Sequence, residues 1–252
     1  MKLKSFALTS TSVLASAFLA SAGEPVETTT APPPASSGDG GMFDEVGITL
    51  STGWDGDYIF RGVDFGDNLL WTDVNLTLPV ADALELNVGS WYASLAEDDY
   101  TELNLYAGLS YAVTDSLTIG VGYLRYDFPS SGAEEINEFG ATIGYSIAGL
   151  DLGAGYYHDD VTDGSYIEVG VGYSIALCES VTLDPGVIVG FGDDYYGVNG
   201  GNHVAPRLSL SIQLTESAVL SPYVAYNIPI DSLDDAGEPD EFYGGVSLAV
   251  SF

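Results

Sequence analysis

The residues with the clearest chemical potential are acidic side chains that alternate with apolar ones along the chain. Successive side chains of a β-strand point to opposite faces, so each of these acids would lie on the face opposite to the apolar residues. Two arginines share that face with the acids. The set comprises Asp55, Asp57, Arg61, Asp73, Glu85, Glu102, Glu138, Asp151, Glu168, Asp184 and Arg207. A face of this composition would attract cations and repel anions.

The two histidines, His158 and His203, are the candidates for general-base chemistry. His158 is followed by Asp159 and Asp160 and falls on the apolar register, where a membrane-embedded lipase would hold its base. The spacing identifies no serine nucleophile beside it, because a catalytic triad is an arrangement in space that sequence order does not reveal. We therefore interpret both histidines as exposed residues near loops and expect no catalytic residue and no enzymatic activity.

Acidic residues also gather in the longer polar connections, where carboxylate oxygens could collect Ca²⁺ or Mg²⁺. None of these clusters has the spacing of an EF-hand, so we predict neither a dedicated metal site nor a cofactor. Weak binding of divalent cations is the most that we expect. Its candidate ligands are Asp159, Asp160, Asp163, Asp234 and Asp235.

The composition requires a structure that separates acidic from apolar surface. The 252 residues include 37 acids and five bases, and yet charged residues make up 17% and the mean hydropathy is +0.18. Such a chain repels phosphates, which excludes nucleic-acid binding. It is also too apolar to be a disordered polyanion.

The first 45 residues differ from the rest. Lys2 and Lys4 precede a short apolar stretch and the small residues Ala20-Ser21-Ala22, a pattern typical of a cleaved Sec-type signal peptide over residues 1–22. Residues 23–45 are rich in Pro, Thr, Ser and Gly and are predicted to be a disordered linker.

From residue 46 to residue 252 the hydrophobic period is two, which predicts strands. Residues 167–177, for example, place Ile, Val and Tyr opposite Glu, Gly and Ser. Most of the strands have the roughly 9–11 residues that a tilted strand needs to cross a bilayer. We predict about twelve, over residues 46–62, 69–79, 84–94, 101–111, 117–127, 136–147, 150–158, 166–177, 181–192, 203–214, 218–228 and 241–252.

The connections alternate between tight turns and longer polar loops, the longest being 193–202 and 229–240. This layout is typical of outer-membrane barrels, whose short turns are periplasmic and whose long loops are extracellular. Aromatic residues of the apolar face, among them Trp54 and Phe60, gather near the strand ends as interfacial girdles do. The predicted fold is therefore all-β: a transmembrane, antiparallel, up-and-down barrel over residues 46–252, exported to the bacterial outer membrane.

Two short motifs support this prediction. Phe252, with Val250 and Leu248 at alternate positions before it, resembles the terminal signal that barrel-assembly machinery reads. The stretch Asp57-Tyr58-Ile59-Phe60-Arg61-Gly62 resembles the Tyr-x-Phe-Arg-Gly sequence that opens the exported barrels of the Gcw_chp family, although Asp64 stands where Ser or Thr is expected. That family has no assigned activity, so the resemblance implies a porin-like fold and no particular chemistry.

The functional hypothesis is a passive diffusion channel with an acidic, cation-preferring lumen that passes small cationic or neutral solutes. Its other expected partners are outer-membrane lipid, lipopolysaccharide and the barrel-assembly machinery. The first alternative is a non-conducting structural or surface-interaction barrel that acts through its acidic extracellular loops, the inward acids and arginines forming a plug. The third hypothesis is an outer-membrane lipase with His158 as its base.

Overall fold

The alternation of apolar and polar side chains produces long antiparallel strands throughout the part of the chain that the structure describes. The computed structural model describes residues 46–252, so the predicted signal peptide (1–22) and linker (23–45) lie outside the described residues. The strands are β1 (Gly47–Phe60), β2 (Val63–Ala81), β3 (Leu84–Leu95), β4 (Thr101–Thr114), β5 (Leu117–Asp127), β6 (Ile136–Ile147), β7 (Leu150–Asp159), β8 (Ser165–Tyr173), β9 (Ile175–Cys178), β10 (Val181–Tyr195), β11 (Val198–Thr215), β12 (Ala218–Pro229) and β13 (Glu241–Ser251). One short helix, α2 (Ser232–Ala236), lies between β12 and β13.

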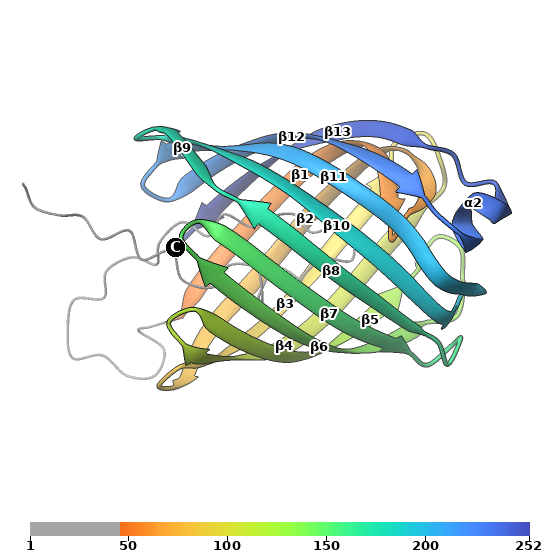
Figure 1. Cartoon of the computed structure of the whole chain (residues 1–252), viewed down its shortest axis with the longest axis horizontal. Helices are drawn as coiled ribbons and strands as arrows, with labels where there is room; N and C mark the ends of the chain where they lie inside the picture. Colours follow the sequence, from red (N-terminus) through yellow and green to blue (C-terminus); the bar gives the residue numbers. More distant parts are fainter. Residues whose placement is uncertain (1–45) are drawn as a thin grey trace, which may run out of the picture.

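These strands close into a barrel (Figure 1). Apart from the short β9, consecutive strands pair with each other, and β13 pairs with β1 to complete the ring. Because β8 and β9 both pair with β10, β9 continues β8 after a break at Ser174. β8 and β9 together occupy one strand position in the wall, so the barrel has twelve strand positions. This confirms the predicted strand number and the up-and-down topology.

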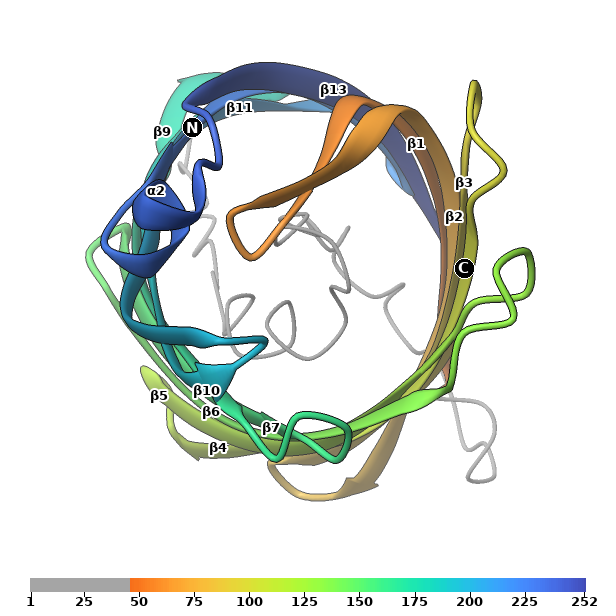
Figure 2. The same cartoon turned by 90° about the vertical axis from the view of Figure 1, so that its right-hand side faces the viewer.

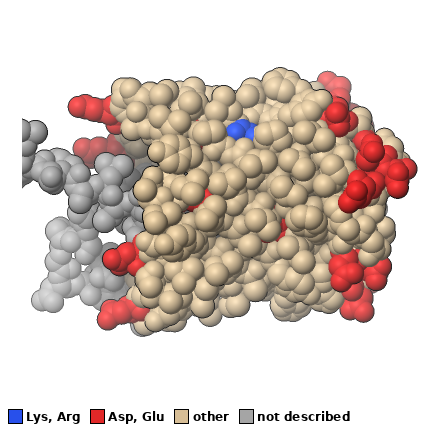
Figure 3. Space-filling model, viewed as in Figure 1, with Lys and Arg blue, Asp and Glu red and all other residues tan. Residues whose placement is uncertain are grey.

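The outer face of the barrel is apolar, whereas polar and acidic side chains lie in its interior. Large apolar side chains lie exposed on the outside, with 56% of Val121 and 58% of Phe139 accessible, whereas acids such as Glu102 are buried inside. Figure 3 shows one face of the molecule, with most acidic atoms gathered at the two ends and a broad, largely uncharged band between them that contains a blue basic patch and small red acidic spots. An exposed apolar band flanked by polar ends is the surface of a transmembrane barrel.

The two ends of the barrel differ in their connections. The turn end carries the tight turns, such as 82–83 and 148–149, and the loop end carries longer connections and α2. The predicted loop 193–202 is wrong, because β10 and β11 continue as a hairpin up to the turn at Tyr196-Gly197. Among residues 46–252, no helix has the length and apolar character to cross a membrane.

The hairpin of β1 and β2 departs from the wall of the barrel. Figure 2 views the loop end, where this hairpin bends inward across the opening. A β-bulge between Asp57 and Ile59 shifts the register, and both Tyr58 and Ile59 are buried. Bulges bend the strand that carries them. Phe60, predicted on the lipid face, consequently packs inside, where its ring centroid lies 6.1 Å from that of Tyr126.

Candidate functional site

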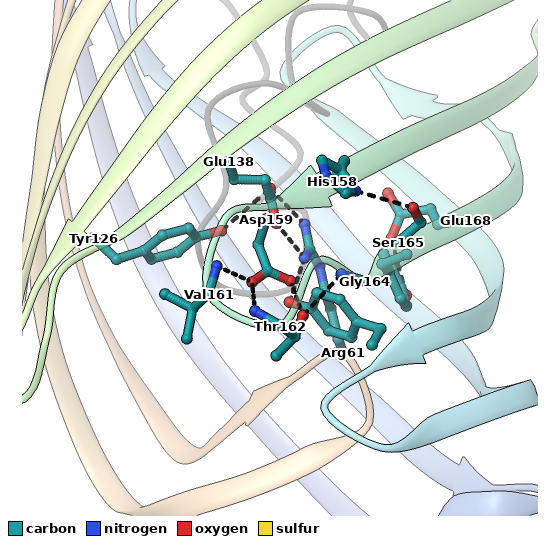
Figure 4. Close-up of polar contacts among 12 residues, drawn as sticks. Arg61, Tyr126, Glu138, His158, Asp159, Val161, Thr162, Gly164, Ser165 and Glu168 are labelled. Atoms are coloured by element: carbon teal, nitrogen blue, oxygen red, sulfur yellow. Dashed lines mark hydrogen bonds and ion pairs between the residues drawn. The ribbon is translucent and has the colours of Figure 1, made fainter.

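The tip of the inward hairpin is anchored by one buried ion pair. Arg61 donates from Nη1 to Glu138 Oε2 at 2.6 Å and from Nη2 to Glu138 Oε1 at 2.8 Å (Figure 4). Nη1 also donates to the hydroxyl of Tyr195. Bidentate pairs of this kind fix orientation as well as contributing energy. The ion pair thus joins the β1–β2 turn to β6 on the barrel wall.

Aromatic rings surround the Arg61 guanidinium. Its Cζ lies 4.5 Å from the ring centroid of Tyr166, 4.7 Å from that of Tyr157 and 4.8 Å from that of Phe60. These distances are within the range of cation–π attraction. The rings also exclude water from the ion pair, so its electrostatic attraction acts in a low-dielectric setting.

The turn itself depends on Gly62. Its φ of +85° is disfavoured for residues with a side chain, and a Cβ there would lie 2.8 Å from the Cβ of His203. The backbone carbonyl of Gly62 accepts a hydrogen bond of 2.9 Å from the Asn227 side chain. The Arg61-Gly62 pair singled out in the sequence is therefore the point where the hairpin docks inside the barrel.

The docked hairpin lines a cavity of about 420 Å³, here named the loop-end cavity. Its lining is rich in aromatic residues and includes two buried acids, Glu102 and Glu138. The lining aromatic residues are Tyr58, Phe60, Phe65, Tyr100, Tyr126, Phe128, Tyr195 and Tyr196.

A second cavity, the turn-end cavity, has a volume of about 670 Å³ and shares no lining residue with the first. Its lining is rich in serine and threonine and includes four acids but no Lys, Arg or His of the described residues. Asp184 accepts hydrogen bonds from Ser174 at 2.7 Å and Ser211 at 2.9 Å. The four lining acids are Asp115, Asp151, Glu179 and Asp184.

Three further acids from the predicted lumen set lie among aromatic side chains of the barrel interior. Asp55 accepts hydrogen bonds of 2.7 Å from Trp71 and from Tyr223. Asp73 accepts one of 2.9 Å from Tyr106. Glu168 accepts one of 3.4 Å from Tyr166, and the Arg207 Cζ lies 3.7 Å from the ring centroid of Tyr223.

The remaining members of that set are dispersed. Asp57 lies opposite Asp67 in the β1–β2 hairpin, and Glu85 is an exposed residue near the turn end. Glu102 and Glu138 line the loop-end cavity, while Asp151 and Asp184 line the turn-end cavity. The structure therefore places four of the predicted acids in two cavities and three beside aromatic side chains, and it leaves Asp57 and Glu85 outside these groups.

The histidines differ from each other in environment. His203 is buried and its ring stacks on Tyr166, so its interpretation as an exposed histidine is wrong. His158 contacts Ser165 through Nδ1 at 3.3 Å and Asp163 through Nε2 at 3.4 Å. Sequence reasoning missed Ser165, which lies across the β7–β8 hairpin from His158.

This histidine, serine and aspartate grouping lacks the surroundings of a triad. The Asp163 side chain is 97% exposed, so it orients the imidazole weakly. The nearby backbone N–H groups of Val161 and Thr162 donate to the Asp159 carboxylate (Figure 4). Those donors are therefore engaged and do not face a developing oxyanion.

The loop acids proposed as weak ligands for divalent cations have separate environments. Asp159 accepts hydrogen bonds from its own loop, and Asp160 accepts two of 2.8 Å from Asn137. Asp234 and Asp235 lie exposed in α2. Residues 46–252 contain no group of three or more His, Cys, Asp or Glu side chains arranged to hold a metal ion.

The predicted assembly residues lie at the closure of the barrel. Leu248 and Val250 of β13 pair with Thr52 and Leu50 of β1, and the Phe252 N–H donates to the Ile48 carbonyl at 2.9 Å. The recognition of these residues by assembly machinery stays a prediction.

Several aromatic residues of the loop-end cavity were not predicted as site residues. Phe65 falls between two predicted strands, and Tyr100 and Phe128 flank predicted strands. Their position in the sequence could have indicated them, because each lies just before or just after one of three predicted strands whose ends meet at the same end of the barrel.

The fold and the docked hairpin together define a porin-like transmembrane β-barrel. The model of the family described as "Bacterial protein of unknown function (Gcw_chp)" matches residues 43–193, and the chain belongs to this family. None of the curated protein sequences compared with the chain matches it.

Solved porin structures share the architecture. The KdgM porin superposes with a TM-score of 0.52 at 11% identity, covering 82% of this chain and 99% of that one. The COG4313 outer membrane channel from Pseudomonas putida F1 gives 0.51 at 11% identity, with 82% and 94% covered. The NanC porin gives 0.50 at 12% identity, with 81% and 98% covered. At these identities the likeness establishes the fold alone.

Proposed function

We propose that this protein is a porin-like channel of the bacterial outer membrane that admits small cationic or neutral solutes. The observation that carries the proposal is the turn-end cavity, whose lining holds four acids and, among the described residues, no base. A vestibule lined by one sign of charge concentrates the opposite ion and repels its own. By the usual orientation of such barrels, the turn end faces the periplasm and the loop end faces outward.

The charge of the lining argues against anionic solutes. One structure of the KdgM porin is described as a complex with disordered oligogalacturonate, which is a polyanion. Here the acids of the turn-end cavity would oppose such a ligand, and Arg61 in the loop-end cavity is already paired with Glu138. We therefore do not extend that ligand class to this chain.

The docked hairpin favours a second candidate, a non-conducting structural or surface-interaction barrel. The Arg61–Glu138 pair holds the hairpin across the opening, and the two cavities share no lining residue. In the channel hypothesis, conduction requires the hairpin to move or solutes to pass beside it. In the alternative, the hairpin is a permanent plug and the acidic loops are the functional surface.

Planar-bilayer recordings under a KCl gradient distinguish these candidates. We expect conductance steps and a reversal potential of the sign that indicates cation preference. The double variant Asp151→Asn/Asp184→Asn should reduce that preference, whereas Asp163→Asn, in an exposed outer loop, should leave it unchanged. Anion preference would overturn the acid-lined mechanism.

A variant without the ion pair, Arg61→Met/Glu138→Met, completes the test. Steps in this variant and none in the wild-type barrel would identify the hairpin as a closed gate. The absence of steps in both proteins would overturn the channel and leave the non-conducting barrel.

The remaining partners follow from the proposed location. We propose that the apolar band contacts outer-membrane lipid, that lipopolysaccharide surrounds the loop end, and that Leu248, Val250 and Phe252 present the strand read by barrel-assembly machinery. Removal of Phe252 should lower the amount of assembled barrel in outer-membrane fractions, while exposed-loop changes such as Asp163→Asn should not.

A further inference from the structure

We propose that the loop-end cavity binds a small organic ammonium ion that carries an apolar or aromatic group. This proposal names a class of solute for the proposed channel. It rests on the channel function only for the path by which the solute leaves the cavity. Binding itself requires the cavity alone, whose volume of about 420 Å³ suits a molecule of roughly ten to fifteen non-hydrogen atoms.

The first observation is the buried carboxyl group of Glu102. Its residue is 2% exposed, and its carboxylate accepts hydrogen bonds from Tyr58 at 2.9 Å, Tyr100 at 2.5 Å and Asn104 at 2.7 Å. These three donors favour the ionised form of the carboxyl group, whereas its burial opposes ionisation, so a cation beside Glu102 would stabilise the ionised form further. Within residues 46–252, no ion pair involves Glu102, because the nearby Arg61 is bound to Glu138.

A buried carboxylate without a cationic partner loses hydration that its hydrogen bonds restore only in part. A ligand cation placed beside Glu102 would supply the missing charge. The lining of the cavity also includes Glu238, which follows α2. Its charged residues are therefore three acids, Glu102, Glu138 and Glu238, and one base, Arg61. The balance favours a cation over an anion.

The second observation is a continuous aromatic wall next to Glu102. The Tyr58 ring centroid lies 5.5 Å from that of Phe65 and 6.1 Å from that of Tyr100. Phe65 and Tyr100 are 6.4 Å apart, and Tyr100 and Phe128 are 6.3 Å apart. Aromatic faces attract ammonium groups, most strongly quaternary ones, and shield them from water.

The same wall excludes other ligand classes. A Ca²⁺ or Mg²⁺ ion requires six or more oxygen ligands, whereas aromatic rings flank Glu102, its carboxyl group is already hydrogen-bonded, and Glu138 is bound to Arg61. An anion would meet the uncompensated Glu102 and Glu238. An ammonium ion with an attached hydrocarbon satisfies both the charge and the apolar lining.

Equilibrium binding to the whole protein in detergent micelles tests this proposal. The probe is benzyltrimethylammonium, compared with phenylacetate and benzyl alcohol as its anionic and neutral counterparts, and binding is measured by isothermal titration calorimetry. We expect saturable binding of the ammonium probe and weak or no binding of the other two. Equal binding of all three would show a merely apolar pocket and overturn the proposal, as would no binding of the ammonium probe.

The variant Glu102→Gln should weaken ammonium binding by about tenfold, while Glu85→Gln, at the exposed turn end, should leave it unchanged. Should Glu102→Gln not fold, Phe65→Leu supplies the test, since Phe65 is 45% exposed and its loss should weaken binding several-fold. Unchanged affinity in both variants would overturn the site. A barrel that binds the probe but shows no conductance would retain this site and lose the channel function.

Discussion

Arg61 and Glu138 are 77 residues apart in the chain and are joined inside the barrel by two hydrogen bonds of 2.6 and 2.8 Å. Arg61 lies at the tip of a hairpin that has left the wall, and Glu138 lies on β6 within the wall. The ion pair therefore ties the inward hairpin to the barrel wall.

Replacing one partner of the ion pair should lower the free energy of unfolding strongly, whereas replacing both partners should lower it much less. Glu138→Met leaves Arg61 buried without its partner, and we expect a loss of about 3–5 kcal/mol in the free energy of unfolding. The double variant Arg61→Met/Glu138→Met removes both charges and should recover much of that loss. Urea unfolding of the barrel in phospholipid vesicles, followed by tryptophan fluorescence, measures each value; additive losses would contradict a direct coupling.

The hairpin turn should be sensitive to a side chain at Gly62 beyond the effect of its backbone angle. Gly62→Ala should destabilise the docked hairpin by about 1–3 kcal/mol, because φ is +85° and the new Cβ would lie 2.8 Å from the Cβ of His203. Gly132→Ala is the matched control, since its φ is +64° and a Cβ there would have no other atom within 4 Å. The same unfolding assay should show the larger loss for Gly62→Ala, and equal losses would mean that the packing against His203 is unimportant.

The strands could be predicted from sequence because each one is encoded locally. The period-two pattern over residues 117–127 and 136–147 needs no distant partner, and β5 and β6 have these same bounds. Their outward faces follow from the same alternation, as the exposure of Val121 and Phe139 confirms.

The interior could not be predicted in the same way. The bulge between Asp57 and Ile59 changes which face the following residues occupy, and no alternation rule anticipates it. Arg61 and Glu138 come together only when the barrel closes. They are 77 residues apart, and no local pattern in the sequence indicates that they pair. The surroundings of Glu102 likewise come from separate strands and loops.

The loop after β7 should have a measurable acid response. Hydrogen bonds from the backbone N–H and side chain of Asn137 lower the pKa of Asp160 below its ordinary value. A folded-state pKa that is depressed stabilises the fold at pH above the unfolded value, and that contribution is lost as the pH falls through the folded value. The loop contact should therefore persist at about pH 4 and weaken only below it.

A carboxyl ¹³C titration of aspartate-labelled protein tests this expectation. Asn137→Ala removes the side-chain donor and should raise the pKa of Asp160 towards its ordinary value, while its backbone donor remains. Asn199→Ala, which alters the exposed end of the β10–β11 hairpin, should leave that titration unchanged. An Asp160 titration that is the same with and without the Asn137 side chain would refute the assigned cause.

A charge on the apolar band should prevent stable insertion, whereas the same charge in a loop should not. Val121 lies in the middle of β5 with 56% of its surface exposed, so Val121→Arg would place a guanidinium in the hydrocarbon layer. The expected cost is about 2–4 kcal/mol at the bilayer midplane. Val161→Arg is the control, because Val161 is comparably exposed but lies in the connection between β7 and β8. Folding into phospholipid vesicles, measured by heat-modifiable mobility on gels, should fall for Val121→Arg alone; equal folding of both variants would contradict the membrane-spanning position of β5.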